Sequence, residues 1–108
     1  MLNVPDRIGH LELADLRHQL LRLLERLEPS AERRGFHHES PSRRVARLRE
    51  QGTIPRDIAS LMFVVLDFRN RSEYEGVVPE GPAAAAVWAA WQAIEAFCAS
   101  EPTPAAVH

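Results

Sequence analysis

Apolar residues recur at helical spacing in four stretches of the chain. In the clearest stretch, leucines stand alternately three and four residues apart, at positions 13, 16, 20, 23 and 27. Leu11, Leu21 and Leu24 widen this stripe into a broad apolar face. The spacing predicts an amphipathic helix over about residues 9–28, which Pro29 and Ser30 end. It is too short for a free coiled coil, so we expect it to pack inside a bundle.

A second, shorter helix is predicted after a loop over residues 29–40. Ser40 is a good N-cap and Pro41 suits the first helical position. The helix is expected to reach about residue 51, to bury Val45 and Leu48, and to end at Gly52. Its other face carries four arginines that we expect to be exposed, namely Arg43, Arg44, Arg47 and Arg49.

The third apolar stretch begins at Thr53, Ile54 and Pro55, with Asp57 placed to complement the helix dipole. Its centre, LMFVVLDF over residues 61–68, also has the composition of a buried strand. The start signals and the length favour a helix. We expect a loop to follow from about residue 72 to Gly81.

The last stretch predicts an alanine-rich helix from Pro82 to about residue 98. Its apolar stripe comprises Val87, Trp91, Ile94 and Cys98. Residues 100–108 contain two prolines and are expected to fray. The chain is thus predicted to be one all-α domain over residues 1–108, a four-helix bundle with its core over about residues 9–98.

Composition and charge exclude some classes of function but do not identify one. The 108 residues carry a net charge of −2, which argues against a nucleic-acid coat or a polybasic membrane binder. Eleven arginines and eight acids give residues 1–56 a charge of +3, whereas residues 57–108 carry −5. This division favours self-association or partner docking, although solvated polar faces explain it equally well.

Cellular location is predicted from what the chain contains. Its single cysteine, Cys98, cannot form an internal disulfide, which favours a reducing compartment. We find no leader segment and no apolar run long enough for a bilayer. The expectation is a cytoplasmic protein without a membrane partner.

Polar residues close the third apolar stretch, in the segment LDFRNRSEYEG over residues 66–76. Arg69 and Asn70 stand where the interior of a bundle would meet its end. One interpretation is purely structural: Arg69 pairs with Glu73, and Asn70 caps the C-terminus of the helix.

The same segment also resembles a known family. Leu48, Gly52 and Ile54 form a lead-in of the pattern L-x-x-x-G-x-I, followed by the long helix that ends in Arg69-Asn70 and by the alanine-rich closing helix. Over about residues 40–98 the chain resembles the HEPN superfamily, particularly its small abortive-infection-type branches. The resemblance implies a helical bundle that dimerises, and in many members a metal-independent endoribonuclease of toxin–antitoxin or antiviral systems.

One departure from the family pattern bears on catalysis. The resemblance implies an active-site histidine after Arg69 and Asn70, but Tyr74 stands at the matching position. Tyrosine titrates near pH 10 and is therefore a poor base at neutral pH. We expect a non-catalytic interaction module that forms homodimers or binds a partner protein, with a defence setting implied only by the resemblance. The alternative is an endoribonuclease that uses Arg69, Asn70 and Tyr74.

Other candidate sites carry weaker signals. Arg43, Arg44 and Arg47 could contact RNA phosphate. Residues 45–61 imitate a helix-turn-helix, which would make the chain a small DNA-binding regulator, but the would-be recognition helix is too apolar to read base edges. His37 and His38 are adjacent and poorly placed to share a metal. No metal, cofactor or phosphate-binding glycine loop is predicted.

Overall fold

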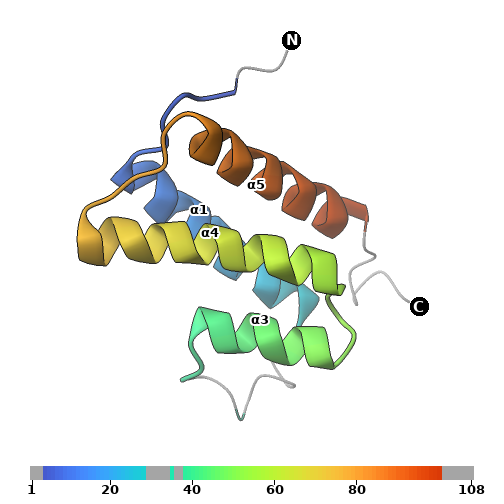
Figure 1. The fold of residues 1–108 in the computed structure, drawn as a ribbon. Helices are drawn as coiled ribbons and strands as arrows, with labels where there is room; N and C mark the ends of the chain where they lie inside the picture. The colour runs from blue at the N-terminus through green and yellow to red at the C-terminus, as the bar shows by residue number, and fades with distance from the viewer. Residues whose placement is uncertain (1–3, 29–34, 36–37, 101–108) are drawn as a thin grey trace.

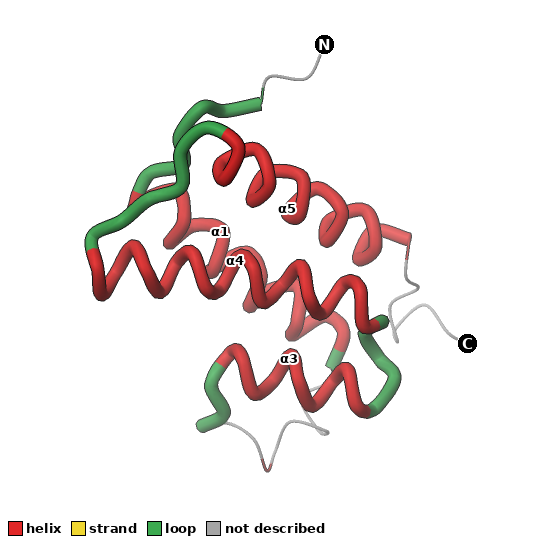
Figure 2. The backbone as a smooth tube through the Cα atoms, in the orientation of Figure 1, coloured by secondary structure: helices red, strands yellow, loops and turns green. Residues whose placement is uncertain are grey.

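A computed structural model describes residues 4–28, 35 and 38–100 of the chain. Within these residues the fold is built from helices α1 (His10–Leu27), α3 (Pro41–Glu50), α4 (Arg56–Glu75) and α5 (Pro82–Ser100). Figure 1 shows α4 across the middle of the bundle, between α5 and α3, with α1 packed behind it. The all-α bundle predicted from the apolar spacing is confirmed. Residues 61–68 are helical, so the alternative of a strand is wrong (Figure 2).

The helix ends follow the local sequence signals. Ser40 caps α3, and its hydroxyl accepts a hydrogen bond from the Arg43 N–H at 3.3 Å. Gly52 follows α3 with a φ of 78°, a left-handed conformation that glycine adopts without steric cost. At the start of α1, the Gly9 N–H donates to the Glu12 carboxylate at 3.0 Å. These contacts satisfy backbone groups that a helix leaves free at its ends.

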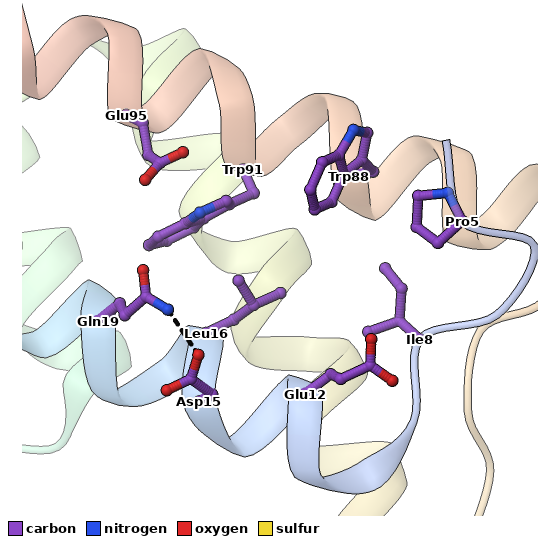
Figure 3. A pocket seen from close by; sticks show the side chains of 9 residues that line it. All are labelled: Pro5, Ile8, Glu12, Asp15, Leu16, Gln19, Trp88, Trp91 and Glu95. Carbon is purple, nitrogen blue, oxygen red and sulfur yellow. Dashed lines mark hydrogen bonds between the residues drawn. The ribbon is translucent and has the colours of Figure 1, made fainter. Parts of the chain in front are cut away.

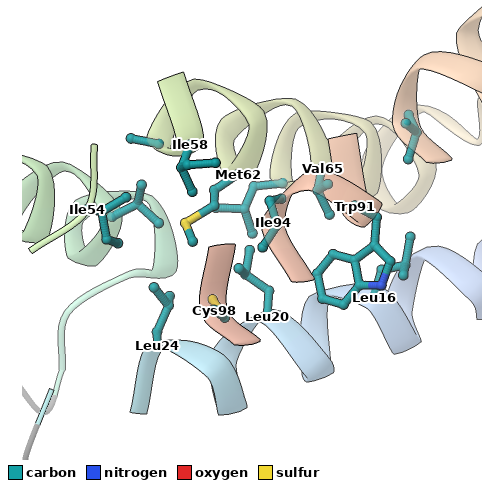
Figure 4. Packing of buried hydrophobic residues seen from close by; sticks show 14 of the residues in the cluster. Leu16, Leu20, Leu24, Ile54, Ile58, Met62, Val65, Trp91, Ile94 and Cys98 are labelled. Atoms are coloured by element: carbon teal, nitrogen blue, oxygen red, sulfur yellow. The ribbon is translucent and has the colours of Figure 1, made fainter. Parts of the chain in front are cut away.

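The core lies where the four apolar stripes meet. Leu20 and Leu24 of α1, Met62 and Val65 of α4, and Ile94 of α5 are fully buried there (Figure 4). Ile54, in the turn before α4, closes the end of the core near α3. The predicted stripe of α5 is confirmed as core, and so is the first part of the predicted leucine seam, Leu13, Leu16 and Leu20. Leu23 and Leu27 are only partly buried, and Leu11, expected to widen the apolar face, is 86% exposed, because it lies on the side of α1 that faces away from α4 and α5.

The central helix, α4, packs against α1, α3 and α5, whereas α1 and α5 touch each other much less. The apolar part of α4 that would be the recognition helix of a helix-turn-helix has Met62, Val65 and Leu66 buried in the core. This placement leaves those side chains no access to a DNA groove. None of the four described helices combines the length and the apolar composition that crossing a bilayer requires.

The segment before α1 is bound to the turn before α5. The Ile8 N–H donates to the Pro79 carbonyl at 3.1 Å, and the Gly81 N–H donates to the Asp6 carbonyl at 2.7 Å. Ile8 is buried in the core. These hydrogen bonds fix the directions in which the chain enters α1 and α5.

Candidate functional site

Arg69, Asn70 and Tyr74 lie within the last two turns of α4. The helix continues to Glu75, and Gly76 ends it in the left-handed conformation with a φ of 71°. The predicted loop from residue 72 therefore begins about four residues too early. Asn70 does not cap the helix, because more than a turn of helix follows it.

Arg69 is engaged by its own helix. Its guanidinium forms an ion pair with Glu73, one turn further along, and Nη1 lies 3.5 Å from the side-chain oxygen of Asn70. Only 20% of the Arg69 side chain is exposed. The predicted structural pairing of Arg69 with Glu73 is confirmed. The Glu73 carboxylate offsets the positive charge of Arg69, which a phosphate group would need for binding.

The side chains of Tyr74 and Arg69 leave the α4 backbone in different directions. The two residues are five positions apart, which turns their side chains by about 140° around the helix axis. Tyr74 is 78% exposed, and the exposed Asn70 lies one turn before it on that face. Asn70 and Tyr74 thus share one exposed face, while Arg69 lies on a different and more covered one.

A histidine does approach this end of α4, from a part of the chain that the sequence patterns did not single out. The Nδ1 atom of His10, the first residue of α1, is hydrogen-bonded to the hydroxyl of Ser72. Ser72 is buried, whereas His10 is exposed. The pair joins residues 62 positions apart, and no local motif could have indicated it.

The arginines of α3 are not all exposed as expected. Arg44 is buried, and Arg47 and Arg49 are partly covered, so the expectation of a solvated arginine face is wrong for these three. Of the three arginines considered as phosphate contacts, Arg43 is exposed, but Arg44 and Arg47 point to carboxylates.

Glu28 is the centre of this buried ion-pair network. Its carboxylate receives two hydrogen bonds from the Arg47 guanidinium, one of them at 2.8 Å, and lies 3.3 Å from Nε of Arg44. Arg47 also donates to Glu39, at 2.8 and 2.9 Å. The hydrogen bonds from Arg47 hold the pKa of Glu28 below its ordinary value, against the opposing effect of burial. The same carboxylates raise the pKa of Arg47.

A groove runs between α1 and α5, and we call it the α1–α5 groove. One end, a hollow of about 280 Å³, has an apolar floor and a carboxylate rim (Figure 3). Its lining residues are Pro5, Ile8, Glu12, Asp15, Leu16, Gln19, Trp88, Trp91 and Glu95. The other end, a hollow of about 310 Å³, is lined by Gln19, Arg22, Leu23, Arg26, Trp91 and Glu95. Gln19, Trp91 and Glu95 line both hollows, so the two hollows are adjacent.

No metal centre or reactive thiol is found in the described residues. Among them, no group of three histidine, cysteine or carboxylate side chains could hold a metal ion. His38 is exposed, and His37 lies outside the described residues. Cys98 is buried against the core, as predicted. The predicted loop over residues 29–40 and the predicted tail are also mostly outside the described residues.

Comparison of the chain with protein-family models, with curated proteins and with solved structures found no match. Function is therefore inferred from the local geometry.

Proposed function

We propose that this chain is a non-catalytic helical interaction module of HEPN type that acts as a homodimer. The observation that carries the proposal is that the Arg69 guanidinium is already engaged by Glu73 and Asn70, while Tyr74 is 78% exposed. An RNA-cleaving site needs a cation free to stabilise phosphate charge and a group that moves protons near neutral pH. This end of α4 offers an arginine already paired with a carboxylate, a solvent-exposed phenol, and the imidazole of His10, which is hydrogen-bonded to the buried Ser72 hydroxyl.

The α1–α5 groove supports the interaction part of the proposal. It combines apolar side chains with charged groups along its rim, and such surfaces bind other proteins. The resemblance to the HEPN superfamily adds homodimerisation and a setting in defence or toxin–antitoxin systems. A binding role requires no further catalytic group from the chain.

Incubation of the full-length protein with structured RNA in EDTA tests the absence of catalysis. We expect wild-type protein and Arg69→Ala to leave the RNA equally intact. Cleavage by the wild type that is lost in Arg69→Ala would overturn the proposal and favour the endoribonuclease.

Light scattering coupled to gel filtration tests the dimer. We expect a mass near 24 kDa, twice that of one chain of 12.2 kDa. A mass of one chain at high micromolar concentration would contradict the homodimer. Salt-dependent binding of duplex DNA with a sequence preference would instead favour the DNA-binding regulator.

A further inference from the structure

We propose that two copies of this chain associate through the α1–α5 groove, with α1 of each copy seated antiparallel in the groove of the other. The inference rests on the homodimer of the proposed function and names the surface that forms it. In this arrangement the two α1 helices are neighbours across a two-fold axis, and an α5 helix flanks each of them.

The order of charges along α1 points to this partner. Five polar residues of α1 line the groove at alternating spacings of three and four, namely Glu12, Asp15, Gln19, Arg22 and Arg26. The two before Gln19 are acids and the two after it are arginines. The groove is therefore negative towards the N-terminus of α1 and positive towards its C-terminus.

This charge order is complementary to itself when the helix is reversed. A two-fold axis near Gln19 sets Asp15 of one copy opposite Arg22 of the other, and Glu12 opposite Arg26. Because a two-fold interface repeats each contact, both pairs form twice. Glu12 and Arg26 are about 21 Å apart along the helix axis. The charge pairs would therefore be distributed over much of the length of α1.

Three of the four charged groups that would form these pairs, Asp15, Arg22 and Arg26, form no ion pair in the single chain with any residue that the structure describes. The fourth, Glu12, accepts a hydrogen bond from the Gly9 N–H through Oε1. Among the described residues Glu95 likewise forms no ion pair, and Asp15 accepts a hydrogen bond at 2.6 Å from neighbouring Gln19. Pairing across the axis would therefore not have to break an existing ion pair. Leu16 and Trp91 are already buried in the single chain, so the apolar contribution of association would come from covering the partly exposed Trp88.

The same charge order disfavours a uniformly charged peptide as the occupant of the groove. A uniformly basic peptide would be attracted to Glu12 and Asp15 but repelled by Arg22 and Arg26. A uniformly acidic peptide meets the opposite problem. An occupant that matches both ends must carry base and acid in reversed order, and α1 of a second copy has this order.

Charge reversal tests the surface by equilibrium sedimentation of the full-length chain. Asp15→Arg and Arg22→Asp should each raise the dimer dissociation constant at least tenfold, because each change places like charges opposite one another twice. The double variant carrying both changes restores opposite charges across the axis and should recover most of the affinity. Glu75→Arg, the same kind of charge reversal at an exposed position of α4 outside the groove, should leave the dimer unchanged.

The outcomes separate this inference from the proposed function. A wild-type dimer that is insensitive to both single reversals would show that another surface joins the chains, and the homodimer would stand. A double variant as weak as the single ones would also overturn the antiparallel pairing. A wild-type monomer at high micromolar concentration would overturn both. Thermal melting by circular dichroism should show the native fold in every variant, since Asp15 and Arg22 are exposed.

Discussion

Glu28, at the end of α1, binds Arg47 of α3 through both carboxylate oxygens. Only 1% of the Glu28 side chain and 14% of the Arg47 side chain are exposed. A carboxylate withdrawn this far from water is stable only while its partners supply hydrogen bonds. The pair therefore makes the packing of α1 on α3 depend on charge.

Stability should fall in acid partly through Glu28. Hydrogen bonds from Arg47 hold its pKa in the folded protein below the ordinary value of 4.5. The resulting stabilisation is present above pH 4.5 and is lost as the pH falls through the lower, folded-state pKa. Urea unfolding of the wild type and of Glu28→Gln between about pH 7 and pH 3 should give a difference in free energy that shrinks towards acid. A constant difference would contradict the assignment.

The same substitution should be costly at neutral pH. Glu28→Gln leaves two guanidinium groups facing a neutral amide in a buried site, and we expect a loss of about 3 kcal/mol. Glu50→Gln, at an exposed position that ends α3, removes an equal charge and should cost less than about 0.5 kcal/mol. Equal unfolding free energies for the two variants would show that the network does not stabilise the fold.

Two leucines of α1 offer a matched test of the core. Leu20 is fully buried, whereas Leu11 is 86% exposed. Leu20→Ala should cost about 2–5 kcal/mol through the cavity that it leaves, and Leu20→Asp should prevent folding. Leu11→Ala should change the free energy of unfolding by less than about 0.5 kcal/mol. Equal unfolding free energies of the two alanine variants, measured by chemical denaturation, would contradict the assignment of the buried face of α1.

Gly76 permits the backbone turn that ends α4. Its φ of 71° lies in the left-handed region, and a methyl group at this position would meet no described atom within 4 Å, so backbone strain alone should decide the effect of substitution. Gly76→Ala should cost about 1 kcal/mol. Gly76→Asn should cost less, since asparagine tolerates this conformation. Thermal melting should rank the three proteins in this order, and an alanine variant as stable as wild type would contradict it.

The hydrogen bond between His10 and Ser72 should contribute modestly to stability. Ser72→Ala removes the hydroxyl from a buried position and leaves the exposed imidazole of His10 able to bind water. We expect a loss of about 1 kcal/mol. Ser60→Ala, on an exposed face of the same helix, serves as the control and should have a smaller effect in urea unfolding.

Local signals in the sequence predict the fold well. The leucine spacing defines the buried face of α1, Ser40 and Pro41 define the start of α3, and Gly52 defines its end, because each effect acts within a turn or two of chain. The end of α4 is predicted too early, since polar residues after Phe68 suggest a loop. The helix continues to Gly76, whose left-handed conformation ends it, and the pairs Asp67–Arg71 and Arg69–Glu73 add modest stability to its last turns.

The features that the sequence patterns did not predict depend on contacts between distant parts of the chain. Arg44 and Arg47 have the pattern of a solvated face, and only the position of Glu28 in the folded chain reverses that interpretation. The approach of His10 to Ser72 and the joining of α1 and α5 into one groove likewise depend on how the helices pack. The pairing of Arg69 with Glu73 is predictable because it lies within one turn of α4.

The central position of α4 also has a consequence for biosynthesis. During translation, all residues of α1 and α3 are added before Arg56, the first residue of α4. Until α4 arrives, the leucines of α1 lack the surface that later covers them. Cooperative collapse should therefore await translation of the second half, and a truncated product ending near residue 55 should be a ready substrate for chaperones and proteases.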